Sequence, residues 1–137
     1  MTSTIVDSNI FIDIFNGGQQ RGWSRNLLAE AGGVGTLVVN PIIWSEISVR
    51  FRDTDALEHA LTGLAIERAV IPYEAAFLAG KKHEEYRRTG GQRDRTLPDF
   101  MIGAHAAVAG HRLLTRDATR YRSYFPNLAI IAPDTHP

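Results

Sequence analysis

The sequence predicts an α/β protein, a three-layer α/β/α domain built on a parallel sheet. Five short apolar runs alternate with segments of helical pattern, as in sheets that helices cover on both faces. The length of 137 residues suits a single domain, residues 1–137, with one core. Because crossovers between parallel strands are right-handed, few topologies remain, and we expect the common strand order 3-2-1-4-5.

The predicted elements follow one another along the whole chain. Strands are expected at residues 4–6, 35–39, 69–71, 112–115 and 128–131. Helices are expected at residues 10–15, 21–31, 41–51, 55–64, 73–88, 98–109 and 118–124. Asn40-Pro41 supplies an N-cap and a first-turn proline, Leu97-Pro98-Asp99 repeats this device, and Gly110 ends the helix at 98–109.

Composition excludes several other classes of protein. With 44% hydrophobic and 22% charged residues, the chain is typical of globular rather than disordered proteins. No apolar run approaches the ~20 residues that span a bilayer, and the N-terminus lacks a signal-peptide pattern. We therefore expect a cytoplasmic protein with no membrane partner. The absence of cysteine excludes a disulfide scaffold, a thiol nucleophile and cysteine-ligated metal sites.

The net charge of zero hides an asymmetry along the chain. Residues 1–80 carry five basic and nine acidic side chains, whereas residues 81–122 carry ten basic and five acidic ones. Local clusters, rather than the total charge, attract polyanions. A neutral total therefore leaves a nucleic-acid partner open, although a solvated helix face with ion pairs explains the cluster at residues 81–88 equally well.

Four acidic residues lie where this fold exposes side chains. Asp7 directly follows the first predicted strand, and Asp117 follows the fourth. If these strands are neighbours, both carboxylates lie at the carboxyl edge of the sheet, where open α/β sheets bind ligands. Glu46 lies on the apolar face of its predicted helix, where a carboxylate needs a partner. Asp99 opens the helix at 98–109, which places it at the rim of the same crevice.

A structural role can explain each acid taken singly. Asp7 and Asp117 could cap the helices that follow them, Asp99 could interact with the dipole of its own helix, and Glu46 could pair with Arg50 or Arg52. Four carboxylates in one crevice would repel each other by about 1 kcal/mol per pair at 4 Å in water, and by about 4 kcal/mol at an effective dielectric constant of 20. Such a crevice persists only if cations neutralise it, and oxygen ligands favour Mg²⁺ or Mn²⁺ over zinc.

Four segments together carry a resemblance to a known family. They are Ile5-Val6-Asp7-Ser8-Asn9-Ile10, Glu46 in an early helix, Leu97-Pro98-Asp99-Phe100-Met101-Ile102-Gly103-Ala104-His105-Ala106 and Leu114-Thr115-Arg116-Asp117. In order and spacing they resemble a PIN domain, and most closely the VapC-type toxins of bacterial type II toxin–antitoxin pairs. The resemblance covers nearly the whole chain and implies a PIN-like fold.

The resemblance also implies a function. Proteins of this kind are endoribonucleases that hydrolyse RNA phosphodiesters with Mg²⁺ or Mn²⁺, and a cognate antitoxin silences them. By position, the acids that match the family's catalytic and metal-binding set are Asp7, Glu46, Asp99 and Asp117. Thr115 matches the usual hydroxyl residue, and Asn9 is a second supporting candidate. Phosphodiester hydrolysis needs an activated water and positive charge beside the phosphate, which carboxylate-held cations provide.

The expected partners follow from charge, apolar surface and resemblance. Candidate RNA-binding residues in the basic half are Arg93, Arg95, Arg112 and Arg116, each of which could equally form a surface ion pair. The resemblance implies a homodimer. The number of apolar side chains also favours a homodimer, because one small sheet does not need all of those around Ile12, Phe15, Leu27 and Leu28. We expect the antitoxin to cover the acidic crevice, with an arginine that pairs with the acids.

Two other classes of α/β protein fit the sequence less well than the nuclease. A phospho-receiver domain needs its acceptor aspartate after the third strand, where this chain has Ile71-Pro72-Tyr73. A haloacid-dehalogenase-like phosphatase needs a second aspartate two residues after Asp7, where Asn9 stands. The main alternative is a catalytically inactive PIN-like module that binds RNA or a partner protein.

Overall fold

The computed structural model describes residues 2–90 and 95–137. Its sheet consists of β1 (Thr4–Val6), β2 (Leu37–Val39), β3 (Ile66–Arg68), β4 (Arg112–Leu114) and β5 (Ile130–Ile131). All neighbouring strands are parallel, in the order β3-β2-β1-β4-β5. The predicted α/β class, parallel sheet and strand order are confirmed.

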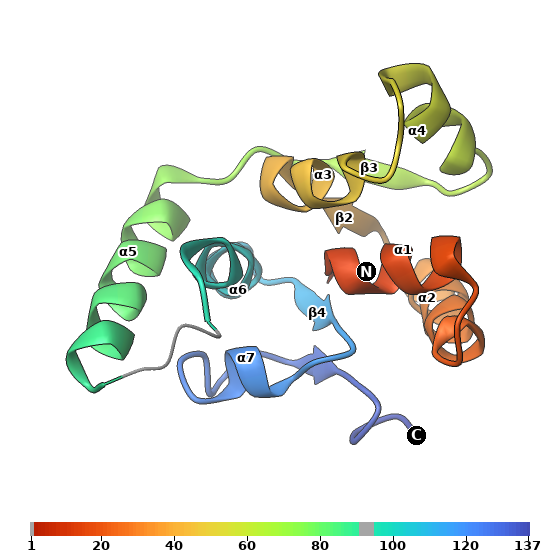
Figure 1. The fold of residues 1–137 in the computed structure, drawn as a ribbon. Coiled ribbons are helices and arrows are strands. Elements are labelled where there is room, and N and C mark those ends of the chain that lie inside the picture. The colour runs from red at the N-terminus through yellow and green to blue at the C-terminus, as the bar shows by residue number, and fades with distance from the viewer. Residues whose placement is uncertain (1, 91–94) are drawn as a thin grey trace.

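Helices cover both faces of this sheet. They are α1 (Ser8–Asn16), α2 (Arg21–Val34), α3 (Pro41–Ser48), α4 (Thr54–Ala60), α5 (Tyr73–Arg88), α6 (Leu97–Ala109) and α7 (Thr119–Arg122). In Figure 1, α1 and α2 lie together on one side of the strands and α5 and α6 on the other. The helices α3 and α4 lie towards β3, and α7 lies towards β5, which gives the three predicted layers.

The central strands are buried because both of their faces are covered. Every residue of β1 and β2 is buried, as are Leu113 and Leu114 of β4. Such strands have continuous apolar sequences, which is why the sequence pattern located them. The predicted caps also form: Asn40 Oδ1 accepts a hydrogen bond from the Ile43 N–H at 2.9 Å, and Gly110 ends α6 with φ +75°.

The third strand was predicted in the wrong place. It was expected at residues 69–71, but Ile66–Arg68 pairs with β2 instead. This strand lies at the edge of the sheet, with Ile66 half-buried and Glu67 and Arg68 exposed. A search for a continuous apolar run passes over such a strand, and Val70, inside the predicted run, is 80% exposed.

The apolar side chains that favoured a homodimer are used within the chain. Leu27 and Leu28 of α2 are buried in the core, and Ile12 and Phe15 of α1 pack against it. Leu27 and Leu28 therefore offer little apolar surface to a second copy, whereas Ile12 and Phe15 are only partly buried, and the homodimer stays a prediction. The large apolar side chains that the structure leaves exposed include Val49, Val70, Tyr73 and Phe77. Across the two described ranges, no helix combines the length and apolar character needed to cross a bilayer.

Candidate active site

The strands β1 and β4 are parallel neighbours, so their carboxyl ends lie side by side at one edge of the sheet. The chain leaves β1 at Asp7, whose backbone N–H still donates to Leu114 O of β4 at 2.9 Å. It leaves β4 at Thr115, and Asp117 follows two residues later. The switch point between these strands is where ligands bind in open α/β sheets.

Asp7 is buried at this edge and held by several donors. Its Oδ1 accepts from the Ser8 N–H at 2.8 Å, which caps α1. Its Oδ2 accepts from the Tyr121 hydroxyl at 2.7 Å and from the Thr115 hydroxyl at 2.9 Å. Burial raises the pKa of Asp7, the donors Tyr121 and Thr115 oppose this, and the charge of Asp99 raises it further. The carboxylate is thus rigidly oriented but costly to ionise.

Thr115 and Asn9 connect Asp7 to the segment that carries Asp117. The Asn9 amide nitrogen lies 3.3 Å from Thr115 Oγ1 and 3.5 Å from Asp7 Oδ2. The Asp117 N–H donates to Thr115 Oγ1 at 3.1 Å, and Asn9 Oδ1 accepts from the Arg116 N–H at 3.2 Å. Both predicted supporting residues therefore lie beside Asp7.

Glu46 reaches the same edge from α3, where it is half-buried. The Ser8 hydroxyl donates to its Oε1 at 2.9 Å. Burial raises the pKa of Glu46, Ser8 opposes this, and the charges of Asp7 and Asp99 raise it further. Three of the four acids therefore influence one another electrostatically. The suggested ion pairs do not form, because Arg50 donates to Asn16 Oδ1 at 2.7 Å and Arg52 lies 3.6 Å from Asp53.

The two carboxylate oxygens of Asp99 have different partners, one in the cap of α6 and one on Arg120. Its Oδ2 accepts from the Thr96 N–H at 3.0 Å and from the Thr96 hydroxyl at 3.2 Å, which caps α6. Its Oδ1 faces Arg120, whose Nη1 lies 3.4 Å away. The side chain is only 7% exposed, and because the cap holds Oδ2, Oδ1 is the oxygen that faces Arg120.

Arg120 of α7 links two of the four acids. Its Nε donates to Asp117 Oδ2 at 2.9 Å while its Nη1 lies beside Asp99. Burial alone would lower the pKa of Arg120, but the charges of Asp99 and Asp117 outweigh it and raise the pKa. Asp117 also accepts from the Thr119 hydroxyl at 2.6 Å. The guanidinium thus supplies positive charge between carboxylates that would otherwise repel one another.

Sequence reasoning missed three residues of this site. Ser8 bridges towards Glu46, Tyr121 donates to Asp7, and Arg120 joins Asp99 to Asp117. The spacing of three residues between Asp117 and Arg120 could have indicated their ion pair. No sequence signal distinguished Tyr121 from an ordinary core aromatic residue.

The predicted RNA-binding arginines lie in different places. Arg112 begins β4, at the opposite edge of the sheet from Asp7, and donates to Thr4 Oγ1 at 3.0 Å. Arg116 lies beside Asp117 but pairs with the buried Asp13 at 2.7 Å. Arg95 donates to Ser123 Oγ at 2.7 Å, and its guanidinium lies 5.8 Å from the Tyr124 ring centroid. Arg93 lies outside the described residues.

The donor chemistry of the four acids fits Mg²⁺ or Mn²⁺, since every candidate ligand is a carboxylate oxygen. Within residues 2–90 and 95–137, however, no three histidine, aspartate or glutamate side chains are grouped so that they could together hold a metal ion. Asp99 and Asp117 form ion pairs with Arg120 instead. A divalent ion would therefore have to displace Arg120 from these two acids.

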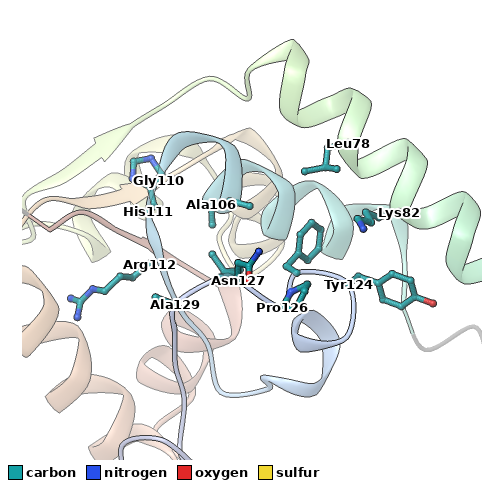
Figure 2. A pocket seen from close by; sticks show the side chains of 13 residues that line it. Leu78, Lys82, Ala106, Gly110, His111, Arg112, Tyr124, Pro126, Asn127 and Ala129 are labelled. Atoms are coloured by element: carbon teal, nitrogen blue, oxygen red, sulfur yellow. The ribbon is translucent and has the colours of Figure 1, made fainter.

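A cavity of about 470 Å³ lies away from the four acids. Figure 2 shows it near the start of β4, with His111 and Ala129 at one end and Lys82 and Tyr124 at the other. The side chain of Arg112, although it belongs to the lining, points away from the hollow in this view. The cluster of four acids and this cavity are therefore separate features of the structure.

Comparison with known proteins assigns the fold. Residues 4–125 match the PIN domain, so the chain belongs to the PIN-domain family. Its structure resembles a chain of VapBC2 from Rickettsia felis (TM-score 0.73, 17% identity, 96% of this chain and 98% of that one). It also resembles a chain of a toxin–antitoxin complex from Klebsiella pneumoniae (TM-score 0.68, 21% identity, 95% and 97%).

A third similar structure is VapBC-1 from nontypeable Haemophilus influenzae, with a TM-score of 0.73, 15% identity and coverage of 96% and 98%. A search of curated protein sequences finds no match. The expected membership of the PIN family is thus confirmed, and the structural relatives share its fold.

Proposed function

We propose that this protein is a divalent-metal-dependent endoribonuclease that hydrolyses RNA phosphodiesters and acts as the toxin of a type II toxin–antitoxin pair. One observation supports this most strongly. On a PIN fold, burial raises the pKa of Asp7, which directly follows β1, and of Glu46 on α3, and the charge of Asp99 on α6 raises both pKa values further. Acids brought together from three elements at a ligand-binding edge favour cation binding over purely local structural roles.

Each of the four acids has a proposed role. Asp7 and Asp99 are the proposed direct ligands of Mg²⁺ or Mn²⁺, and Glu46 and Asp117 complete the site directly or through water. A bound cation would supply an activated water and positive charge beside the scissile phosphate. The donors Tyr121 and Thr115 fix the orientation of Asp7, and Thr96 fixes that of Asp99. Arg95 and Arg116 are the proposed phosphate contacts near this edge.

The proposed protein partners are an antitoxin and a second copy of the chain. The similar solved structures include VapBC complexes and FitAcB from Neisseria gonorrhoeae, which support a toxin–antitoxin assembly. We propose that the antitoxin covers the crevice and pairs an arginine with the acids. If a purified complex leaves all four acids open to solvent, inhibition works in another way.

Cleavage of labelled single-stranded RNA tests the proposed activity. The wild-type protein should cut with Mn²⁺ or Mg²⁺ and stop when EDTA is added. Asp7→Asn should lower kcat/KM by at least about 100-fold, equivalent to about 2.7 kcal/mol of transition-state stabilisation. Asp134→Asn is the matched control, because Asp134 is exposed and pairs with Arg122 outside the site. Equal cleavage by wild type and Asp7→Asn would refute the proposal.

A catalytically inactive module that binds RNA or a protein is the second candidate. The pairing of Arg120 with Asp99 and Asp117 favours it, because a site that never binds metal still needs its acids neutralised. Expression in bacteria separates the two functions. Growth arrest by the wild type but not by Asp7→Asn supports the nuclease, whereas arrest by both supports binding alone.

A further inference from the structure

We propose that Arg120 is a built-in counter-cation of the active site. In this hypothesis it holds Asp99 and Asp117 in the metal-free protein, competes with the divalent cation for them, and binds the RNA phosphate once displaced. The inference rests on the proposed function and assigns a substrate-binding role to a residue outside the acidic set. The two ion pairs of Arg120, at 2.9 Å and 3.4 Å, are its starting point.

The position of Arg120 makes it the counter-ion of the site. It joins an acid of α6 to the acid that precedes α7, and its charge also opposes the raised pKa of Glu46. Three other arginines nearby have partners outside the four acids: Arg95 with Ser123, Arg116 with Asp13 and Arg122 with Asp134. Among these four arginines, Arg120 is therefore the one that pairs with acids of the candidate site.

Arg120 and a divalent cation would need the same oxygen. Oδ2 of Asp99 is committed to the N-cap of α6, which leaves Oδ1 for other partners, and Arg120 lies beside that oxygen. Mg²⁺ binds carboxylate oxygens at about 2.0–2.1 Å, so an ion on Oδ1 and the guanidinium beside it would repel each other strongly. Binding of the divalent cation at Asp99 therefore weakens the ion pair with Arg120, and the ion pair weakens binding of the cation.

Arg120 is also the partner that can move. Its side chain is 45% exposed, whereas that of Asp99 is 7% exposed and fixed by the helix cap. A displaced guanidinium would remain at the rim of the crevice, because it is carried by α7 next to Asp117. Guanidinium groups bind phosphate through two parallel hydrogen bonds, which suits Arg120 to the RNA backbone beside the cut bond.

Metal titration without RNA tests the competition. Mn²⁺ binding is measured by electron paramagnetic resonance for wild type, Arg120→Gln, Arg120→Lys and Arg122→Gln. Arg120→Gln should bind Mn²⁺ about 3- to 10-fold more tightly than wild type. Arg120→Lys should lie between them, since it keeps the charge but cannot bridge two carboxylates with one planar group.

Arg122→Gln is the matched control for this titration. Arg122 belongs to the same short helix, is 43% exposed and pairs with an aspartate, but that aspartate is Asp134 outside the site. Its Mn²⁺ affinity should equal that of wild type. Equal or weaker Mn²⁺ binding by Arg120→Gln would overturn the competition, and so would equal tightening in Arg122→Gln.

RNA cleavage at saturating Mn²⁺ tests the second role of Arg120. Arg120→Gln should raise KM for RNA by about 10-fold despite its tighter metal binding, and Arg122→Gln should leave KM unchanged. An unchanged KM in Arg120→Gln would overturn the phosphate contact. A wild-type protein that binds Mn²⁺ but cuts no RNA would refute the proposed function, while the metal titration would still decide the competition.

Discussion

Single carboxylates in this protein serve the fold and the site together. Asp7 caps α1 through Oδ1 while Oδ2 receives Tyr121 and Thr115. Asp99 caps α6 through Oδ2 while Oδ1 faces Arg120. A carboxylate has about four acceptor positions, so a helix cap leaves room for a second task. The structural and functional explanations of these acids are therefore compatible.

We predict that Asp7→Asn stabilises the metal-free protein. Burial raises the pKa of Asp7 above its usual value of 3.8. The favourable contribution of the protonated group is therefore present below that value and is lost as pH rises through the folded-state pKa. At pH 7 the neutral amide should raise the free energy of unfolding by roughly 1 kcal/mol and Tm by about 3–5 °C. Thermal melts in EDTA would check this, and a fall in Tm would contradict it.

We predict that Tyr121→Phe weakens the site without unfolding it. The buried hydroxyl donates to Asp7 Oδ2, and burial together with the charge of Asp7 raises the pKa of Tyr121 well above its usual range, so it remains a donor. Its loss should lower the free energy of unfolding by roughly 1–3 kcal/mol and RNA cleavage by about 10-fold.

Tyr124→Phe is the matched control for this variant. Among the described residues, the hydrogen bond of its hydroxyl is a 3.4 Å contact with Thr89 Oγ1, away from the four acids. Urea denaturation and RNA cleavage should leave Tyr124→Phe close to wild type. If the two variants behave alike, the hydrogen bond to Asp7 does not have the importance assigned to it.

Some residues of the candidate site could be placed from the sequence, and others could not. Asp7 and Asp117 were placed at the carboxyl edge because a charged residue just after a buried strand must emerge there. Arg120 and Tyr121 point into the site because of how α7 packs, and α7 is only four residues long. A segment that short carries too little periodicity to reveal which face is buried.

At the scale of elements, prediction depended on burial and on caps. Strands covered on both faces have continuous apolar sequences, so β1, β2 and β4 were found at nearly the correct residues. The edge strand β3 was predicted at the wrong residues, because a strand at an exposed edge can contain charged residues such as Glu67 and Arg68. Helix α3 begins at the predicted Asn40 cap but ends at Ser48, where no sequence signal marks the boundary.

We predict that Gly103→Ala disturbs the contact between α6 and the segment that follows α7. A Cβ at Gly103 would lie 2.5 Å from the ring of Phe125, which is buried. Overpacking of this kind should cost about 1–3 kcal/mol. It should also weaken cleavage, because a shift of Phe125 moves α7 and therefore Arg120 and Tyr121.

In contrast to Gly103→Ala, we expect Gly80→Ala on α5 to stabilise the protein. A Cβ there meets nothing within 4 Å, and Gly80 is exposed within a helix. The substitution should stabilise the protein by about 0.5–1 kcal/mol, because alanine has the higher helix propensity. Urea denaturation measures the free energy of unfolding of both variants and checks both predictions. A stabilising effect of Gly103→Ala would show that Phe125 can move without cost.

For the whole molecule, strand order decides which charges meet. The order β3-β2-β1-β4-β5 places β1 beside β4, so that Asp7 and Thr115 emerge together. Helices α3 and α6 then bring Glu46 and Asp99 to the same edge, and α7 brings Arg120. The neutral total charge of the chain thus coexists with a local concentration of acids, which Arg120 from the basic half neutralises in part.

We predict that stabilisation by Mn²⁺ increases with pH. Burial raises the pKa of Asp7 and of Glu46 above their usual values of 3.8 and 4.5, and a cation binds only the ionised forms. Metal affinity is therefore lost as pH falls through the raised pKa values. The rise in Tm on adding Mn²⁺ should be largest near pH 7 and shrink towards pH 4.5.

Comparing melts with and without Mn²⁺ at each pH isolates this effect. Burial lowers the pKa of His105 and of His111, so both destabilise the fold on acidification, but they do so equally in either buffer. With the cation at 100 times its Kd, the stabilisation at pH 7 should reach about 2.7 kcal/mol. Asp7→Asn should remove most of it at every pH. A Tm gain independent of pH, or one retained by Asp7→Asn, would mean that Mn²⁺ binds elsewhere on the protein.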